Sequence, residues 1–571
     1  MPNLPRKTLF LLLLSLALNG LLLGHCHNRT WAPSDDGYFA HVAERLVEGE
    51  VLNRDIQSRH GGYVHFIHAG AFSLFGKTLV SLRYPLLFLS MLQAAILYFL
   101  FLPQGVFFAF LASLLINAFG YVHYLSPMTH WYCLFLMILI AASLRLPREN
   151  FFRIPWIGFL LGLLFLFRQL TGIFVAMALI LYLFWERSSA ENKRGFFPSY
   201  ILSLIAGALI FYLMRYGDTL AFILFGIGPC FLIFLGLKQI RLRSRAAAIL
   251  LIQMAFGIFM AALPLLIYHL HYGSLALWWE DAAVRAGSMI EKTSYQSWST
   301  YALYMGKGLM QLLSPSSPTT VLNGLYWIVL PLIPLINGLL LSWTLLKKKI
   351  LEKEEAFALL AVFYSLVSHM LQTHYFLYYS LGLSFIGSLA LLKKYFASLY
   401  RPAVSATVFL TALSVLFHAG QTHERGFAGT LEGRTPPLYK SSQLPKAGVK
   451  MPVEISRKFE GLVQIIHKHT AAEDAIFVLP NNPEIYFLSG RRNAFRFDFL
   501  PTALQNENDL LEIVEEAQKQ RPRLMIYHRG DKYENALTVQ LRETLEKDYQ
   551  LLTDFEEFGI YLLEARKPEF K

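Results

Sequence analysis

The sequence predicts a polytopic α-helical membrane protein that ends in a soluble α/β domain. Of its 571 residues, 55% are hydrophobic and 16% are charged, and the mean hydropathy is +0.42. A soluble protein of this size is far less apolar. Apolar runs repeatedly reach the length that spans a bilayer, and from about residue 453 the composition and the hydrophobic period change together.

The charge distribution argues against a nucleic-acid-binding protein. The chain has 51 Lys and Arg against 39 Asp and Glu, a net charge of +12. These cations do not gather on one soluble face, as nucleic-acid binding requires. Most lie in short loops between apolar runs, and such an excess marks the cytoplasmic side of a membrane. We therefore expect membrane lipids around the protein and no nucleic acid as a partner.

The first apolar run, 8–24, is predicted to be an uncleaved anchor helix. It follows Arg6 and Lys7, which places its N-terminus in the cytoplasm. The sequence after it, LLLGHCHNRTW, lacks the small-residue cleavage site of a secretory signal. A cleaved signal peptide is the alternative.

Further apolar runs bring the expected number of spans to about thirteen. An odd number places the C-terminus on the side opposite the N-terminus, and the basic loops agree with that arrangement. The short loops expected outside carry almost no cations, with Arg168 and Arg215 as the exceptions. The further spans are expected at 82–102, 104–122, 129–145, 154–168, 171–185, 198–214, 219–237, 247–267, 321–345, 356–372, 375–392 and 402–418.

The polar stretches set the domain organisation. Residues 1–420 form a transmembrane module with two long outer loops, 25–78 and 268–320. A linker follows at 421–452, where GRTPPLYKSSQLPKAG is typical of irregular structure. Residues 453–571 form an extracytoplasmic α/β domain, with strands expected at 475–479, 523–528 and 559–565 and helices at 454–470, 506–520 and 534–547.

The first outer loop carries an acidic pair at the start of an amphipathic helix. Asp35 and Asp36 follow the helix-start signal Pro33-Ser34. The helix after them has its apolar residues along one stripe and His41, Glu44, Arg45 and Glu48 off it, so we expect it to lie on the membrane surface. A carboxylate there can reach a lipid-borne substrate. The alternative is that the pair only caps the helix, because Asp is a favoured cap.

The loop as a whole resembles membrane glycosyltransferases of the GT-C fold. One span, an acidic pair followed by Gly-Tyr, then A-x-R-L-x-x-G and a segment ending in L-F-G are similar to bacterial relatives of the dolichyl-phosphate-mannose protein mannosyltransferases, which include the aminoarabinose lipid A transferases. The resemblance covers roughly residues 1–420. It implies a GT-C-like catalytic module in which Asp35 is the catalytic base and Asp36 stands where relatives have Glu. Many relatives have Pro-Pro where this chain has Gly61-Gly62 after His60, so we expect a different shape of acceptor site.

The resemblance implies an inverting glycosyltransferase of the bacterial cell envelope. The donor is a sugar on a polyprenyl phosphate, and the acceptor is an extracytoplasmic lipid, glycan or protein. The localisation implied is the bacterial inner (cytoplasmic) membrane, with the N-terminus cytoplasmic and the C-terminal domain periplasmic. The alternative function is a transporter or flippase of lipid-linked sugars, although no internal repeat is visible.

A lipid phosphate that leaves with developing charge needs cations or hydrogen-bond donors. The runs on either side of Arg168 and Gln169 are each about fourteen residues, or roughly 21 Å, which is short for a ~30 Å bilayer core. Arg168 therefore lies below the outer surface, where an arginine needs a partner. The alternative is an arginine at a helix end whose side chain extends to the membrane interface. His374 and Tyr375 lie in another tight outer turn, and His123, Tyr124 and His130 flank a third, so we expect these turns to converge. The substrate contacts predicted in all are Arg168, Gln169, His374, Tyr375, His60 and Tyr63.

We expect no cofactor and assign no metal ligands. His65 and His68 share a helical face with His60 nearby, which leaves a divalent metal as an alternative. The cysteines, Cys26, Cys133 and Cys230, have no metal-ligand spacing and form no disulfide framework.

Overall fold

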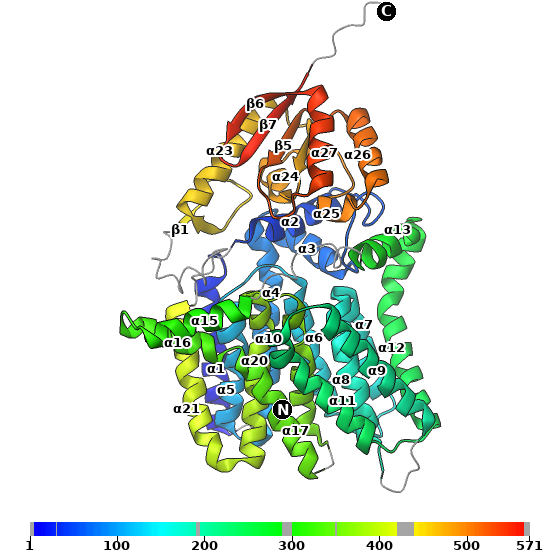
Figure 1. Ribbon diagram of the computed structural model, residues 1–571, viewed down its shortest axis with the longest axis vertical. Coiled ribbons are helices and arrows are strands. Elements are labelled where there is room, and N and C mark those ends of the chain that lie inside the picture. Colours follow the sequence, from blue (N-terminus) through cyan, green and yellow to red (C-terminus); the bar gives the residue numbers. More distant parts are fainter. Residues whose placement is uncertain are drawn as a thin grey trace, which may run out of the picture.

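A bundle of apolar helices carries an α/β region at one end in the computed structural model (Figure 1). The structure describes residues 5–29, 31–189, 195–287, 300–348, 351–418 and 439–564. A layer of short helices, α2, α3 and α13, lies between the bundle and the α/β region. We call the end of the bundle that carries this layer the domain side.

Eight helical segments of the described chain are long and apolar enough to cross a membrane, and the bent pair α16 and α17 makes a ninth if it is counted as one span. The pair bends by 43°. The eight are α1 (Arg6–Cys26), the segment Leu79–Gln104 that contains α4 (Tyr84–Phe101), α8 (Gln169–Glu186), α9 (Phe196–Arg215), the segment Thr219–Gln239 that contains α11 (Ile227–Gln239), α12 (Ser244–His271), α20 (His374–Tyr395) and α21 (Ala397–Leu413) with its π-helical extension η7 (Ser414–His418). The pair is α16 (Pro318–Val329) and α17 (Leu332–Lys348).

The other four expected spans fall on shorter apolar helices, so the structure supports eight or nine full-length spans in place of thirteen. These are α5 (Val106–Ile116) with the π-helical turn η3 (Asn117–Tyr121), α6 (Thr129–Ser143), α7 (Arg153–Phe167), and α18 (Lys353–Tyr364) followed by α19 (Val367–Met370). Three of them end on the domain side beside residues discussed below.

Polar side chains join α1 to its neighbours inside the bundle. The Ser15 and Ser113 hydroxyls lie 2.5 Å apart, and Asn117 donates a 2.6 Å hydrogen bond from its amide to the Asn19 side-chain oxygen. Ser90 donates to Asn117 in turn at 2.7 Å. All five side chains are buried. Amides and hydroxyls in an apolar interior must pair with each other, so these contacts fix how α1, α4 and α5 pack.

The α/β region is built on a five-stranded sheet of order β4-β3-β5-β7-β6. Strands β4, β3 and β5 are parallel, whereas β7 runs antiparallel to both β5 and β6. Every residue of β3 is buried, as expected for a strand covered on both faces. The strands are β3 (Ala475–Leu479), β4 (Arg492–Asn493), β5 (Leu524–His528), β6 (Tyr549–Phe555) and β7 (Phe558–Leu563), and the helices are α23 (Val453–His469), α24 (Pro483–Ser489), α25 (Leu500–Ala503), α26 (Glu507–Gln520) and α27 (Ala536–Leu545).

Part of the expected linker is ordered secondary structure. Strands β1 (Tyr439–Ser441) and β2 (Lys450–Pro452) form an antiparallel pair directly before α23. The Lys450 backbone amide also donates to the Asn28 carbonyl at 2.6 Å, which ties this pair to the end of α1. Residues 419–438 lie outside the described part of the chain.

The described residues of the second long loop include three short elements. These are α13 (Leu275–Trp279), the π-helical turn η5 (Glu280–Arg285) and α15 (Thr300–Leu313), which packs along α16 beside the bundle. Two charged residues of η5 bind the α/β region: Asp281 pairs with Arg496 at 2.7 Å, and Arg285 pairs with Asp509 at 3.3 Å. This loop is therefore a fixed support of that region.

A buried ion pair holds the end of the bundle opposite the domain side. Arg153, at the start of α7, donates to both carboxylate oxygens of Glu186, at the end of α8, at 2.8 and 2.9 Å. Neither side chain is exposed. Arg148 also approaches Glu186, at 3.3 Å, but is 48% exposed.

Changing Glu186→Gln is expected to destabilise the protein by about 3–5 kcal/mol, because it leaves the Arg153 guanidinium buried without its counter-charge. Arg148→Gln removes a mostly exposed partner of the same carboxylate and is the matched control, with an expected loss below about 1 kcal/mol. Thermal unfolding of the detergent-purified proteins measures both. Equal losses for the two variants would contradict the buried role of Arg153.

Candidate functional site

Helix α2 (Pro33–Val47), which carries the acidic pair, lies between the bundle and the α/β region (Figure 1). Its polar face does not meet water. His41, Glu44 and Arg45 are only 4%, 7% and 6% exposed. An amphipathic helix on the membrane surface would leave this face in water, whereas here α24 and Asp498 of the α/β region cover it.

Close backbone contact and charge pairing join α2 to the α/β region. A Cβ added at Gly37 would lie 2.4 Å from the Glu484 backbone, so only glycine lets α24 approach this closely. Asp498 accepts hydrogen bonds from His41 at 2.8 Å and from Arg45 at 3.3 Å. The α/β region thus holds α2 through its polar residues.

The acidic pair does not cap α2. The cap position is Ala32, and Asp35 and Asp36 both lie in the first turn. Their carboxylates make no capping hydrogen bond. The capping alternative is therefore wrong for this helix, and the two carboxylates are available for other contacts.

Asp36 is fully committed to structural contacts. Its side chain is completely buried and forms a 2.8 Å ion pair with Arg83, which is equally buried. The Ser126 hydroxyl donates to its other oxygen. Arg83 also donates to the His27 carbonyl at 2.9 Å. Asp36 therefore ties α2 to the end of α1, to the start of α4 and to the turn before α6.

Asp35 is half-buried and forms no ion pair within the described part of the chain. The Tyr124 hydroxyl makes a long hydrogen bond to it, at 3.4 Å. Tyr124 stacks on Tyr375 with ring centroids 4.9 Å apart, and Tyr379 is close enough to interact electrostatically with Asp35. Asp35 is thus the carboxylate of the pair that forms no ion pair with a described residue, and it lies near the side chains of Tyr124 and Tyr379.

Arg168 lies in the break between α7 and α8, in an extended conformation. Its guanidinium stands 5.5 Å from the centre of the Phe376 ring, and its Nε has no hydrogen-bond partner among the described residues. Tyr379 and His130 interact with it electrostatically. A half-buried arginine without a carboxylate partner is costly, which makes it a candidate for binding an anion.

The Gly-Gly pair brings the first loop against this break. A Cβ at Gly61 would lie 2.3 Å from the Leu166 carbonyl oxygen, so a side chain there would push the loop away from α7. Gly62 has φ +127°, a conformation that L side chains rarely adopt, and it begins α3 (Tyr63–Phe75). These glycines let His60 and Arg168 lie close enough to interact electrostatically.

Histidine and tyrosine residues of two other turns meet in the same place. The His130 ring stacks on Tyr379 with centroids 4.1 Å apart. His130 is fully buried, and neither of its ring nitrogens has a hydrogen-bond partner in the described chain. Tyr375 takes part through its stack on Tyr124. His374 begins α20, but its side chain lies outside the described residues.

Gln169, Tyr63 and His60, which were also predicted to contact the substrate, make contacts within the protein. Gln169 donates to the Ala282 carbonyl at 2.9 Å and so holds η5, and Tyr63 donates to the Ala261 carbonyl at 2.8 Å and so holds α12. His60 is buried and stacks on Phe39 at 5.4 Å. Burial, reinforced by Arg59 and Arg168, lowers the pKa of His60 well below its ordinary value, so this ring is neutral at physiological pH.

No group of three His, Cys, Asp or Glu side chains in the described ranges is arranged to hold a metal ion. Instead, His65 accepts or donates a 2.7 Å hydrogen bond with Ser58, and His68 lies 3.2 Å from the Tyr132 hydroxyl. These histidines serve the packing of α3 against its neighbours.

Sequence reasoning missed two residues beside the site. Arg59 precedes His60 and interacts electrostatically with Arg168, and Tyr379 interacts electrostatically with both Asp35 and Arg168. Arg59 had no distinguishing signal in the sequence, because it is one of five Lys and Arg residues in the first outer loop, 25–78. Tyr379 had none, because nothing distinguishes it from the other tyrosines of an apolar helix.

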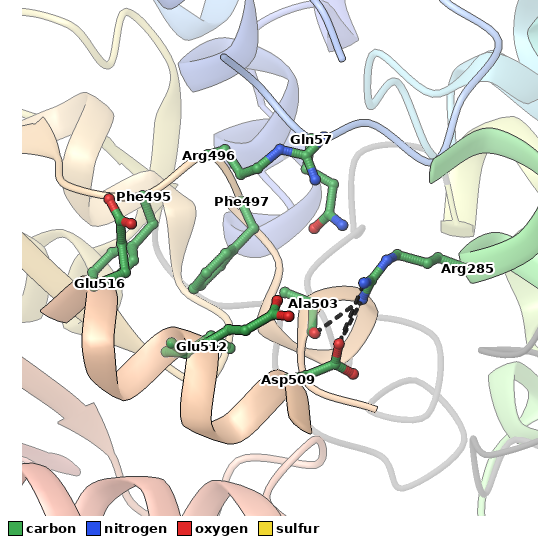
Figure 2. Close-up of a pocket in the computed structure, with 10 residues that line it drawn as sticks. Gln57, Arg285, Phe495, Arg496, Phe497, Ala503, Asp509, Glu512 and Glu516 are labelled. Carbon is green, nitrogen blue, oxygen red and sulfur yellow. Dashed lines mark hydrogen bonds and ion pairs between the residues drawn. The ribbon is translucent and has the colours of Figure 1, made fainter. Parts of the chain in front are cut away.

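A hollow lies where the α/β region meets the two long loops, 25–78 and 268–320 (Figure 2). Its volume is about 230 Å³. Arg285 and Arg496, which line it, are both paired with carboxylates, whereas Glu512 forms no ion pair with a described residue and faces Phe497 across the hollow. The hollow is smaller than the ~300–1,000 Å³ of drug-sized ligand sites.

Comparison with known proteins found similar solved structures. No protein-family model matches the sequence, and no curated protein does. Among solved structures the chain is similar to ArnT from Cupriavidus metallidurans, both in the crystal structure bound to undecaprenyl phosphate and in the apo state. Each match has a TM-score of 0.39 and 12% identity, and they cover 98% and 97% of both chains respectively. Because the similarity is this low, we argue the function from the residues of this chain.

The contact between Asp498 and α2 is expected to depend on pH. Burial alone would raise the pKa of Asp498, but His41, Arg45 and Asn493 lower it to about 2, against an ordinary value of 3.8. A carboxylate with a depressed pKa stabilises the fold fully above the ordinary value and loses that contribution as the pH falls towards 2. The difference in unfolding free energy between wild type and Asp498→Asn should therefore be largest above about pH 5 and shrink by about 2 kcal/mol towards pH 2.

Thermal unfolding between pH 7 and pH 2 measures this difference. The control is Glu473→Gln, which changes an exposed carboxylate of the same region and should leave the stability within about 0.5 kcal/mol of wild type. A constant gap between wild type and Asp498→Asn would mean that the carboxylate charge does not hold α2.

Proposed function

We propose that the protein is a GT-C-type inverting glycosyltransferase that moves a sugar from a polyprenyl-phosphate donor to an extracytoplasmic acceptor. The observation that supports it most is that Asp35, which forms no ion pair with a described residue, and Arg168, which has no carboxylate partner among the described residues, both interact electrostatically with Tyr379. Tyr124 and His130 pack against the same ring. A base and an anion-binding group held at the edge of the membrane are what transfer from a lipid phosphate needs.

Asp35 acts as the general base in this proposal. It accepts the proton of the acceptor hydroxyl while that oxygen attacks the anomeric carbon of the donor. The bond between the anomeric carbon and the phosphate oxygen breaks in the same step, and polyprenyl phosphate leaves with its negative charge. A single displacement of this kind inverts the anomeric centre. Asp36 assists by holding α2, since its oxygens are occupied by Arg83 and Ser126.

Arg168 binds the phosphate that leaves. Its guanidinium has no carboxylate partner among the described residues, so an incoming anion supplies the missing counter-charge. His130, with both ring nitrogens unsatisfied, and neutral His60 add hydrogen-bond donors. Gln169 and Tyr63 support the site by fixing η5 and α12, and His374 and Tyr375 border it from α20.

The orientation follows from the loop charges. Arg145 and Arg187 lie in the turns that follow α6 and α8, and Lys347 lies in the last turn of α17, whereas the α/β region lies at the other end of the bundle. By the positive-inside rule that side is cytoplasmic, so the site and the α/β region face the periplasm of a bacterial inner membrane. The module at 1–420 is then the catalytic part, and the α/β domain at 453–571 covers it. No metal or other cofactor has a role in this proposal.

Replacing Asp35 with Asn is expected to lower sugar transfer by at least about 10²-fold, because it removes the base without a change in size. The assay reconstitutes the protein in liposomes with a panel of polyprenyl-phosphate sugars and a crude acceptor extract, and measures the release of polyprenyl phosphate. Glu473→Gln is the matched control and should retain wild-type activity. Donors that cross the bilayer intact with wild type and Asp35→Asn alike would favour a flippase and contradict the transferase.

Replacing Arg168 with Gln is expected to weaken binding of the donor and of polyprenyl phosphate by about 10- to 100-fold, since a charge-assisted contact to the phosphate is lost. Arg168→Lys keeps the charge but not the planar fork, so partial activity is expected. Donor titrations of the transfer reaction measure both. Unchanged donor affinity in Arg168→Gln would remove Arg168 from the site.

A further inference from the structure

The α/β region contributes to the site through a phenylalanine that orients a second cation. We infer that Phe499 is a positioning residue: it holds the Arg59 guanidinium beside Arg168, so that both cations face the phosphate of the lipid donor. This inference rests on the proposed function. It gives the α/β region a role in donor binding, which the sequence did not indicate.

The geometry places Arg59 between two aromatic rings. Its guanidinium carbon lies 4.3 Å from the centre of the Phe499 ring and 5.3 Å from the centre of the Tyr38 ring. Both distances are within the ~6 Å range of an attractive cation–π contact. Tyr38 belongs to α2, one turn after Asp35, whereas Phe499 immediately precedes α25 of the α/β region. Arg59 therefore bridges the helix with the base and the region that covers it.

Phe499 is itself held rigidly. It is 5% exposed, and its ring packs edge-on against Tyr533 at 5.1 Å. Its neighbour Asp498 is bound to His41 and Arg45 of α2. A short segment of the α/β region thus makes both contacts: Asp498 fixes the helix, and Phe499 fixes the loop that follows it.

Holding Arg59 in place has an electrostatic reason. Arg59 and Arg168 are close enough for each positive charge to disfavour the other, and both disfavour a charge on His60. Repulsion between the two like charges favours movement of the Arg59 side chain away from Arg168. Stacking between Phe499 and Tyr38 opposes that movement, and the two cations then share the attraction for one anion.

The test measures direct binding of undecaprenyl phosphate to the full-length protein in nanodiscs. We expect Phe499→Leu to bind roughly tenfold more weakly, the fold-change that corresponds to loss of one partly buried cation–π contact. Phe499→Tyr keeps the ring and should restore wild-type affinity. Phe495→Leu is the matched control: Phe495 is buried in the same region and packs against Phe477 at 4.1 Å, so it reproduces any general destabilisation and should leave affinity unchanged.

A double variant separates positioning from loss of structure. In an Arg59→Gln background, Phe499→Leu should cause no further loss of affinity, because the cation that it positions is gone. A full additional loss there, or equal losses in Phe499→Leu and Phe495→Leu, would overturn the inference while leaving the proposed function intact. If wild-type protein does not bind undecaprenyl phosphate while purified and folded, the proposed function fails and this inference falls with it.

Discussion

The structure depends on the burial of the polar face of α2. A helix with charged residues on one side and apolar residues on the other normally rests on a membrane, with its charges in water. Here a second surface with matching charges covers it: Asp498 meets His41 and Arg45, and Gly37 removes the side chain that would keep the two apart. The position of the acidic pair is therefore set from both sides. Without the α/β region, α2 would keep the ion pair between Asp36 and Arg83 and lose its contacts with Asp498.

The two adjacent aspartates show how identical side chains take different roles. Asp36 is enclosed and satisfied by a cation and a hydroxyl, so its charge is used to hold helices together. Asp35, one residue away, points elsewhere on the same turn and has a single long hydrogen bond from Tyr124. A reactive carboxylate must be held in place and yet remain available. Asp36 meets the first requirement, because its ion pair holds α2 in place, and Asp35 meets the second, because its carboxylate remains available.

Much of the fold could be predicted from the sequence, because it follows from local periodicity. The strands β3, β5 and β7 and the helices α23, α26 and α27 lie within a few residues of where alternation and helical spacing placed them. The break at Arg168 was also predictable from the short apolar runs on either side. What could not be predicted was contact between distant segments. The pattern of α2 shows that one face is polar, but it cannot show whether water or Asp498 meets that face, and nothing in the order of residues connects Arg59 to Phe499.

The hydrogen bonds that join α1 to α5 also bear on how the protein is assembled. Asn117, directly after α5, donates to the side-chain oxygen of Asn19, ninety-eight positions earlier in the chain. The Asn19 NH2 group can bond within α1, to the Ser15 carbonyl, but until α5 and the turn after it have entered the membrane its side-chain oxygen lacks this donor and lies in hydrocarbon, where an unpaired polar atom is unfavourable. Insertion of the first helix is therefore completed only when a later one arrives, so the two must stay near each other during synthesis. The same amides that give the finished bundle its packing thus make its earliest helix dependent on those that follow.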